Sequence, residues 1–225
     1  MKRYVTLEEI SDGKLYNLND MVKADCHGCI GCSKCCKGMG SSITLDAYDV
    51  YRLTTHLQKS FEELLQDALE LNVVDGVILP NLRMAGEDEC CSFLDEQGRC
   101  SIHEARPGIC RIFPLGRYYE EDGFRYFLQT GECPGSRSKV KVSKWIDTPN
   151  LKENQEFILA WHNLLKRVEE AVLSTEDDEL RKKCNMLFLN VFFIMQYDRE
   201  KDFYEQFYGR LQQFNGILAE LQTNT

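Results

Sequence analysis

The chain lacks an uninterrupted apolar run long enough to cross a membrane, and its first residues lack the apolar segment of a signal peptide. Basic residues are outnumbered, because 27 Lys and Arg face 36 Asp and Glu and leave a formal net charge of −9. Such a charge repels a phosphate backbone. We therefore expect a cytoplasmic protein that binds neither nucleic acid nor membrane.

Two signatures of nucleotide and cluster enzymes are also missing. No glycine-rich G-x-G-x-x-G loop is present to hold a nucleotide. The C-x-x-x-C-x-x-C spacing of radical S-adenosylmethionine proteins is absent, because Met39 stands where a third cysteine would follow Cys32 and Cys36. No side chain stands out as a catalytic base or nucleophile, so the sequence does not decide whether the protein is an enzyme.

Cysteine, by contrast, is abundant, with 11 in 225 residues. Five of them lie between Cys26 and Cys36. Successive C-x-x-C steps place several thiolates on one short loop, an arrangement that binds zinc or an iron-sulfur cluster. In a reducing cytosol such thiols are metal ligands more often than disulfides, and the odd total also argues against complete pairing.

Five more cysteines lie between residues 90 and 133, in segments typical of turns and short strands. Adjacent cysteines rarely chelate one ion together, so the pairs Cys35-Cys36 and Cys90-Cys91 indicate either two neighbouring sites or one ligand beside one structural thiol. Ten thiols would supply two four-ligand centres. The predicted metal ligands are Cys26, Cys29, Cys32, Cys35, Cys36, Cys90, Cys91, Cys100, Cys110 and Cys133.

The identity of the metal is less constrained than the ligands. Four-thiolate sites serve zinc and iron alike, and the crowded C-x-x-C run favours an iron-sulfur cluster of the [4Fe-4S] type, with zinc as the alternative. His27 and His103 are candidate nitrogen ligands. Arg106 and Arg111 flank Cys110, where they either offset negative charge, of a cluster or of a bound carboxylate or phosphate, or pair with acidic side chains of the chain.

The order of the cysteine segments resembles the YkgJ-type cysteine-cluster family. The resemblance rests on residues 29–36, on residues 91–94 with 100–103, and on the segment Arg106-Pro107-Gly108-Ile109-Cys110-Arg111-Ile112-Phe113-Pro114. Members are described as zinc- or iron-chelating domains and are often called Fe-S oxidoreductases, and distant relatives include flagellin lysine methylases. The resemblance therefore implies metal binding over about residues 26–133.

Apolar residues recur at steps of three and four from about residue 150 onward. This pattern predicts three amphipathic helices, one starting at Thr148-Pro149, one over residues 180–195 and one over residues 203–221. We interpret their aromatic stripe as core, and Cys184, which lies on it, as a small buried hydrophobe. The C-terminal part is thus expected to be a three-helix structure.

The first part of the chain has a mixed pattern. It predicts helices over residues 45–57 and 60–71, the second opened by a capping box of Ser60 and Glu63. Asp75-Gly76 and Asp122-Gly123 are turn signals, and the second joins the arms of a hairpin. We predict an α+β fold, with a cysteine-rich, metal-stapled domain of short helices and hairpins over residues 1–147 and a helical region over residues 148–225.

These observations together favour a cytoplasmic metal-binding protein. Its cysteine cluster would hold an iron-sulfur cluster and give the protein a redox or substrate-modifying role with a protein or redox partner. One alternative is a structural zinc-binding module whose helical tail binds another protein. The other, implied by the resemblance, is a cluster-dependent protein lysine methyltransferase. Neither substrate nor oligomeric state follows from the sequence.

Overall fold

The computed structural model describes residues 6–25, 32–133 and 138–223. Eight α-helices and four small antiparallel sheets are found in these ranges, which confirms the α+β class. The chain divides into two compact units, of which unit 1 comprises residues 1–43 and 84–155 and unit 2 comprises residues 44–83 and 156–225. Metal stapling and the domain boundary after residue 147 stay predictions.

Unit 1 contains three of the sheets and a small apolar core. The strands β1 (Ser11–Tyr16), β8 (Gly123–Gln129) and β7 (Leu115–Glu120) form one sheet in that order, while β2 (Met21–Asp25) pairs with β9 (Ser138–Lys141) and β5 (Met84–Ala85) pairs with β6 (Cys90–Cys91). Its short helices are α1 (Leu7–Ile10), η2 (Lys34–Cys36), η3 (His103–Ala105), α4 (Gly108–Ile112) and α5 (Val142–Ile146). The core consists of Val22, Ala24, Ile112, Leu115, Tyr126, Leu128, Val142 and Ile146.

The hairpin of β7 and β8 in unit 1 confirms the turn signal at Asp122-Gly123. The two strands pair from Leu115 opposite Leu128 to Glu120 opposite Gly123. Nearby, the indole of Trp145 donates to the carbonyl of Ile112 at 3.0 Å, which ties α5 to the end of α4. This contact connects the core to the segment that carries Cys110.

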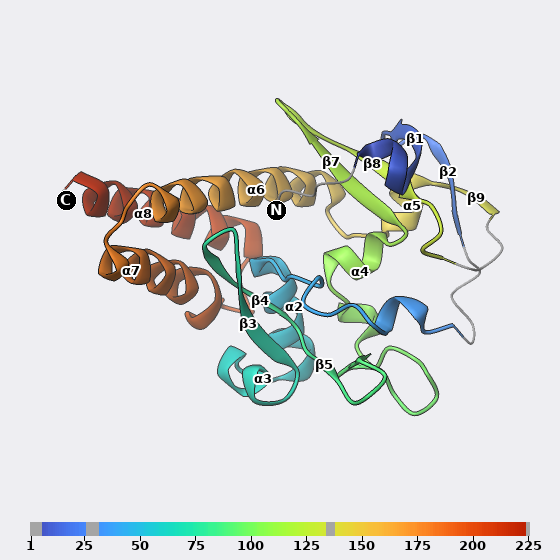
Figure 1. The fold of residues 1–225 in the computed structure, drawn as a ribbon, viewed down its shortest axis with the longest axis horizontal. Helices are drawn as coiled ribbons and strands as arrows, with labels where there is room; N and C mark the ends of the chain where they lie inside the picture. Colours follow the sequence, from blue (N-terminus) through green and yellow to red (C-terminus); the bar gives the residue numbers. More distant parts are fainter. Residues whose placement is uncertain (1–5, 26–31, 134–137, 224–225) are drawn as a thin grey trace. The chain divides into compact units, whose positions relative to one another are not determined.

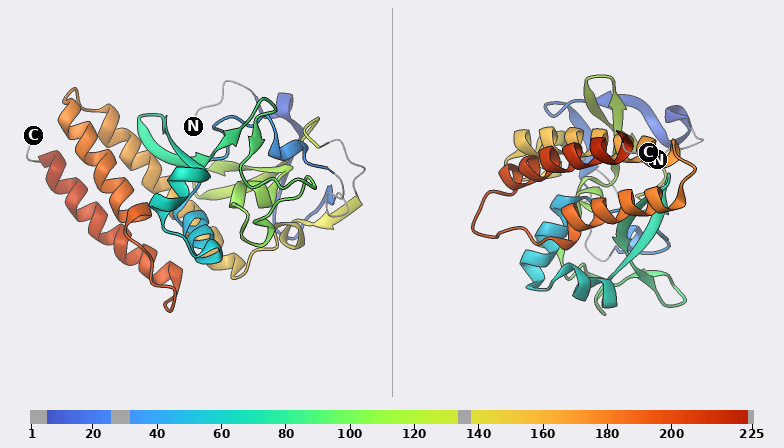
Figure 2. Two further views of the ribbon diagram at one scale, coloured as in Figure 1. Left: turned by 90° about the horizontal axis from the view of Figure 1, so that it is seen from below. Right: turned by 90° about the vertical axis from the view of Figure 1, so that its left-hand side faces the viewer.

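Unit 2 is mainly helical. Its elements are α2 (Ala47–Leu57), α3 (Phe61–Asp67), the paired strands β3 (Leu69–Val74) and β4 (Val77–Leu82), α6 (Leu151–Leu173) from residue 156 onward, α7 (Asp178–Leu189), the π-helical η4 (Asn190–Ile194) and α8 (Phe203–Thr223). The helices α6, α7 and α8 lie side by side (Figures 1 and 2). None of the helices in the described part of the chain combines the length and apolar character that crossing a membrane requires.

The aromatic stripe of the C-terminal helices is the core of unit 2, as predicted. Phe157, Phe188, Phe192, Phe207 and Phe214 are fully buried. Ring contacts link the helices, with Trp161 of α6 against Phe188 of α7 at 5.6 Å between centroids. Cys184 is 1% exposed, which confirms its prediction as a core residue.

Two predicted helices have different ends in the structure. The capping box at the start of α3 is confirmed, because Ser60 and Glu63 exchange hydrogen bonds. The helix stops at Asp67, however, rather than at Leu71, because Leu69 begins a strand that pairs with β4. The helix expected from Pro149 starts only at Leu151, since Asn150 takes a left-handed φ of 50° that no helix accommodates.

The turn predicted at Asp75-Gly76 joins β3 to β4. Both residues have positive φ, 51° and 82°, as a two-residue hairpin turn of type I′ requires. A Cβ atom on Gly76 would also lie 3.2 Å from a methyl carbon of Leu173. Glycine at this position therefore serves both the turn and its packing on the end of α6.

Candidate metal centre

The predicted thiol ligands that the structure describes are spread over several short elements of unit 1. Cys35 and Cys36 lie in η2, Cys90 and Cys91 form β6, Cys100 makes an isolated bridge with Leu94, Cys110 lies in α4, and Cys32 and Cys133 lie in loops. Each described cysteine is a free thiol. Cys26 and Cys29, together with His27, lie outside the described residues.

Backbone pairing joins the two cysteine segments. Lys37, directly after η2, forms an antiparallel bridge with Cys90, and the amide of Gly38 donates to the carbonyl of Glu89 at 3.0 Å. The side chains of Lys37 and Asp88 add an exposed ion pair at 3.8 Å. The segments carrying η2 and β6 therefore lie side by side.

Cys91 and Cys100 each open a turn of the same geometry. The carbonyl of Cys91 accepts the N–H of Leu94 at 2.9 Å, and the carbonyl of Cys100 accepts the N–H of His103 at 3.2 Å. In both turns the sulfur accepts a hydrogen bond from the backbone N–H two residues further on. Backbone N–H groups aimed at sulfur stabilise the thiolate form, which is the form that binds metal.

The residues that donate these N–H groups anchor the two turns. Phe93 and Ile102 are buried, and the amide and hydroxyl of Ser101 both bond to the carbonyl of Phe93, at 2.8 and 3.0 Å. The bridge between Leu94 and Cys100 completes the link. Sequence reasoning missed these sulfur-directed amides, although the repeated pattern Cys-Ser-apolar in both segments was a signal for them.

The thiols of Cys35, Cys91 and Cys100 influence one another electrostatically. A hydrogen bond with the Cys36 thiol, followed by burial, raises the pKa of Cys35 far above its usual value. Burial raises the pKa values of Cys91 and Cys100; the charges of Cys100 and Cys35 raise that of Cys91 further, and the charge of Cys35 raises that of Cys100 further. Because the deprotonated forms oppose one another, a bound cation is what would make them thiolates together.

Arg106 supplies positive charge to this group. Its guanidinium lowers the pKa values of Cys35 and Cys100, opposing the effect of burial. The Nη1 atom of Arg106 lies 3.1 Å from Nε2 of His103, whose pKa is lowered by burial and then by Arg106. Of the two roles left open for Arg106, the structure thus favours the one beside the thiols.

Arg111 has a structural role that differs from the predicted pairing with acidic side chains, because its guanidinium contacts carbonyl and hydroxyl oxygens. It is 6% exposed, and its guanidinium donates to the carbonyl of Arg106 at 3.1 Å and to the hydroxyl of Thr148 at 3.4 Å. These bonds hold the turn that places Arg106. Arg111 therefore stabilises the turn at Arg106 and does not act on the thiols directly.

The donors fit a soft metal, because they are thiols backed by amide and guanidinium hydrogen-bond donors. Within residues 6–25, 32–133 and 138–223, however, no three His, Cys, Asp or Glu side chains come together closely enough to hold a metal ion. Cys35, Cys91 and Cys100 are within electrostatic range of one another, but the described residues do not form a coordination sphere. The ten-cysteine ligand set stays a prediction.

Comparison with known proteins identifies the segment that carries these cysteines. Residues 28–134 match the CxxCxxCC family model, described as "Putative zinc- or iron-chelating domain". The match begins after Cys26 and includes Cys133. No solved structure matches the chain.

Proposed function

Because residues 28–134 belong to the CxxCxxCC zinc- or iron-chelating family, as the resemblance predicted, we propose that this metal-binding chain holds an iron-sulfur cluster. The cluster would serve electron transfer or the modification of a substrate, with a protein or redox partner. Zinc held as a structural ion is the second candidate.

The pair of matching turns at Cys91 and Cys100 carries the proposal. Each turn directs a backbone N–H at its sulfur, and Arg106 adds a guanidinium within electrostatic range of Cys100. Hydrogen bonds to the sulfurs and nearby charge set the reduction potential of iron-sulfur clusters. The surroundings of these thiols therefore suit a negatively charged cluster that changes its charge during turnover.

We assign Cys35, Cys91 and Cys100 to one centre, because their thiols interact electrostatically with one another. When bound, a cluster at this centre would supply one-electron transfer. The chain itself would fix the sulfurs through the link between the turns, and Arg106 would stabilise the thiolates. The remaining cysteines between Cys26 and Cys36, among them Cys32, are candidates for further ligands.

Structural zinc is the second candidate because the three assigned thiols come from separate short elements, η2, β6 and the turn at Cys100. A closed four-cysteine zinc site would staple such elements and take no part in chemistry. It would use the same amide-supported sulfurs, so composition rather than geometry distinguishes the two metals.

Anaerobic purification followed by iron, zinc and acid-labile sulfide analysis tests the proposal. We expect iron matched by sulfide and a broad visible absorption band that bleaches on reduction. Stoichiometric zinc without sulfide or colour, in protein from iron-replete cells, would refute the cluster. Binding of S-adenosylmethionine to the same preparation would extend the role to methyl transfer.

Cysteine variants test the ligand assignment. Cys91→Ser and Cys100→Ser should each lower the metal content, because each removes a thiolate whose turn supports it. Cys184→Ser is the matched control, since this thiol is buried in the helical core of unit 2. Metal content that stays unchanged in both turn variants would contradict the assignment.

A further inference from the structure

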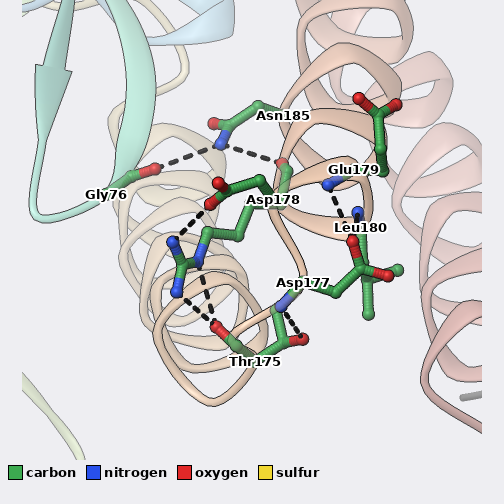
Figure 3. Close-up of polar contacts among 8 residues, drawn as sticks. Gly76, Thr175, Asp177, Asp178, Glu179, Leu180 and Asn185 are labelled. Atoms are coloured by element: carbon green, nitrogen blue, oxygen red, sulfur yellow. Dashed lines mark hydrogen bonds and ion pairs between the residues drawn. The ribbon is translucent and has the colours of Figure 1, made fainter.

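The β3–β4 hairpin of unit 2 has one edge that its own unit covers. On the outer edge of β4, the N–H of Ile78 donates to Oδ1 of Asn185 at 2.8 Å, and the carbonyl of Pro80 accepts the N–H of Leu45 at 2.8 Å. Asn185 also donates to the carbonyl of Gly76 at 3.1 Å, as Figure 3 shows. The outward backbone groups of Ile78 and Pro80 on the edge of β4 are therefore hydrogen-bonded within unit 2.

The opposite edge, on β3, is open. Val73 pairs with Ile78 and Leu71 pairs with Pro80. Opposed residues of an antiparallel ladder point their backbone groups the same way with respect to the hairpin, both inward or both outward. Since Ile78 and Pro80 point theirs outward from β4, Leu71 and Val73 point theirs outward from β3. In the described part of the chain no further strand pairs with β3.

Two side chains on one face of this strand are apolar and exposed. Val73 is 69% exposed and Leu71 is 42% exposed. Proteins usually protect an exposed edge with lysine, proline or a bulge, because an open apolar edge invites another strand. The β3 sequence Leu-Glu-Leu-Asn-Val-Val contains neither lysine nor proline, and its register to β4 is regular.

An apolar hollow lies beside the open edge. It has a volume of about 530 Å³, and Val73, Ile78, Val172, Leu173, Lys182 and Met186 are among its lining residues. Leu173 and Met186 are exposed. The hollow thus adjoins the open strand through Val73 and has room for an apolar side chain.

The cations that line the hollow differ in how far they are neutralised. Arg181 pairs with Asp178 at 2.8 Å and donates to the carbonyl of Thr175 at 2.7 Å, so its guanidinium is engaged. Lys182 is exposed and makes no ion pair with any described residue. An ammonium that makes no ion pair with a described residue, at the rim of an apolar hollow, favours a ligand that joins a carboxylate to apolar side chains.

We propose that β3 and this hollow bind an extended acidic segment of a partner protein. The segment would add a third strand along β3, insert one apolar side chain into the hollow, and place a carboxylate near Lys182. Backbone hydrogen bonds to Leu71 and Val73 would supply affinity, and the hollow with Lys182 would supply selectivity. The proposal does not depend on the metal.

A second copy of the chain fits the site less well. Alternation along β3 places Leu69, Leu71 and Val73 on one face, and Val73 lines the hollow on that face. A second β3 strand paired edge to edge would therefore present apolar side chains and no carboxylate to Lys182. Charge complementarity selects the acidic segment.

Binding of two labelled peptides to the full chain tests the proposal. The acidic probe is fluorescein-labelled Thr-Val-Thr-Asp-Thr-Val-Thr, which places Val and Asp on one face of the added strand, and the basic probe has Lys in place of Asp. We expect fluorescence anisotropy to show binding of the acidic probe only. In ¹⁵N-labelled protein, the same probe should shift the amide signals of Leu71 and Val73.

Three variants refine the test. Lys182→Glu should weaken binding of the acidic probe about fivefold, the size expected for one exposed ion pair. Val73→Pro should weaken it about tenfold or more, because it removes the outward N–H that the added strand would bond, and protects the edge without a change of charge. Lys183→Glu is the matched control, an exposed neighbour of Lys182 with the same charge change, and should alter affinity by less than about twofold.

Several results would overturn the proposal. They are no binding of the acidic probe, equal binding of the basic probe, an equal effect of Lys183→Glu, and signal shifts confined to other elements. Sedimentation that reveals a dimer, abolished by Val73→Pro, would instead assign the edge to a second copy of the chain.

Discussion

Replacing Asn185 by alanine should lower the free energy of unfolding of unit 2, because this side chain joins α7 to the β3–β4 hairpin. Asn185 is 6% exposed. Its Oδ1 accepts the N–H of Ile78 at 2.8 Å, and its Nδ2 donates to the carbonyls of Gly76 at 3.1 Å and Arg181 at 3.2 Å. Asn185→Ala removes all three hydrogen bonds.

The three hydrogen bonds of Asn185 contribute unequally to stability. The carbonyl of Arg181 lies one helical turn before Asn185 and can accept the backbone N–H of α7, so it loses little. The carbonyl of Gly76 and the N–H of Ile78 lose their bonds to α7, at about 1 kcal/mol each and more for a group left without water. We therefore expect the free energy of unfolding to fall by about 2 kcal/mol.

Urea unfolding followed by the fluorescence of Trp161 measures this change. The chain has two tryptophans, and Trp145→Phe removes the one in unit 1, so Trp161 then reports unit 2. Asn190→Ala is the control, since Asn190 is exposed directly after the end of α7 and should change stability by less than about 0.5 kcal/mol.

A loss in Asn185→Ala no larger than in Asn190→Ala would refute the reasoning. It would mean that water replaces the side chain at no cost and that the hairpin is not held by α7. Asn185→Asp provides an additional test, because it keeps an acceptor for Ile78 but places a carboxylate against the carbonyl of Gly76. It should be destabilised as well.

Three further predictions concern pH, packing and metal. Burial lowers the pKa of His162 to about 4 from its usual 6.5, so on acidification the unfolded chain binds the proton before the folded chain does. The contribution of the neutral imidazole to the free energy of unfolding is therefore fully present above pH 6.5 and is lost as the pH falls toward 4. After allowance for partial exposure, this loss is about 1 kcal/mol. The urea midpoint should therefore fall less with pH in His162→Gln, and equal slopes would contradict this. Phe157→Ala should cost about 3–5 kcal/mol by thermal unfolding, because the ring is fully buried against Phe207 at 4.7 Å between centroids, whereas a loss below about 1 kcal/mol would show that the core refills. If the proposed centre holds metal, removing it with a chelator should lower the urea midpoint seen by Trp145 in unit 1 more than that seen by Trp161 in unit 2, and an equal fall in both would argue against a centre confined to unit 1.

Local chemistry made several elements predictable. Ser60 and Glu63 form the expected capping box because a capping box depends only on residues three apart. Asp75-Gly76 forms the expected turn for a similar reason. The long C-terminal helices were predictable from their periodicity, because apolar residues three and four positions apart form one helix face that packs on the core.

Features that depend on contacts between residues far apart in the sequence could not be predicted. The apolar residues Leu69 and Leu71 fit the end of a helix as well as a strand, and only pairing with β4 decides for the strand. The roles of Arg106 and Arg111 were open in the same way. Arg111 has a structural role because Thr148, far along the chain, meets its guanidinium, and no local spacing reveals such a partner.

The cysteines themselves were evident from the sequence, and the family match now supports a chelating role for their segment. Their surroundings were not evident. The amides of Phe93 and Ile102 reach sulfur through the shape of two turns, and a bridge between Leu94 and Cys100 holds those turns together. Residue types can indicate a metal site, but backbone conformation decides how its thiolates are supported.

The interleaving of the two units has a consequence for synthesis on the ribosome. Residues 44–83 emerge long before residues 156–225, with which they share a unit, whereas the last segment of unit 1 ends at residue 155. The cysteine-bearing unit is therefore complete while the nascent chain still lacks its C-terminal helices. By contrast, α2, α3 and the hairpin of β3 and β4 lack the helices that bury their apolar faces until residues 156–225 have been synthesised.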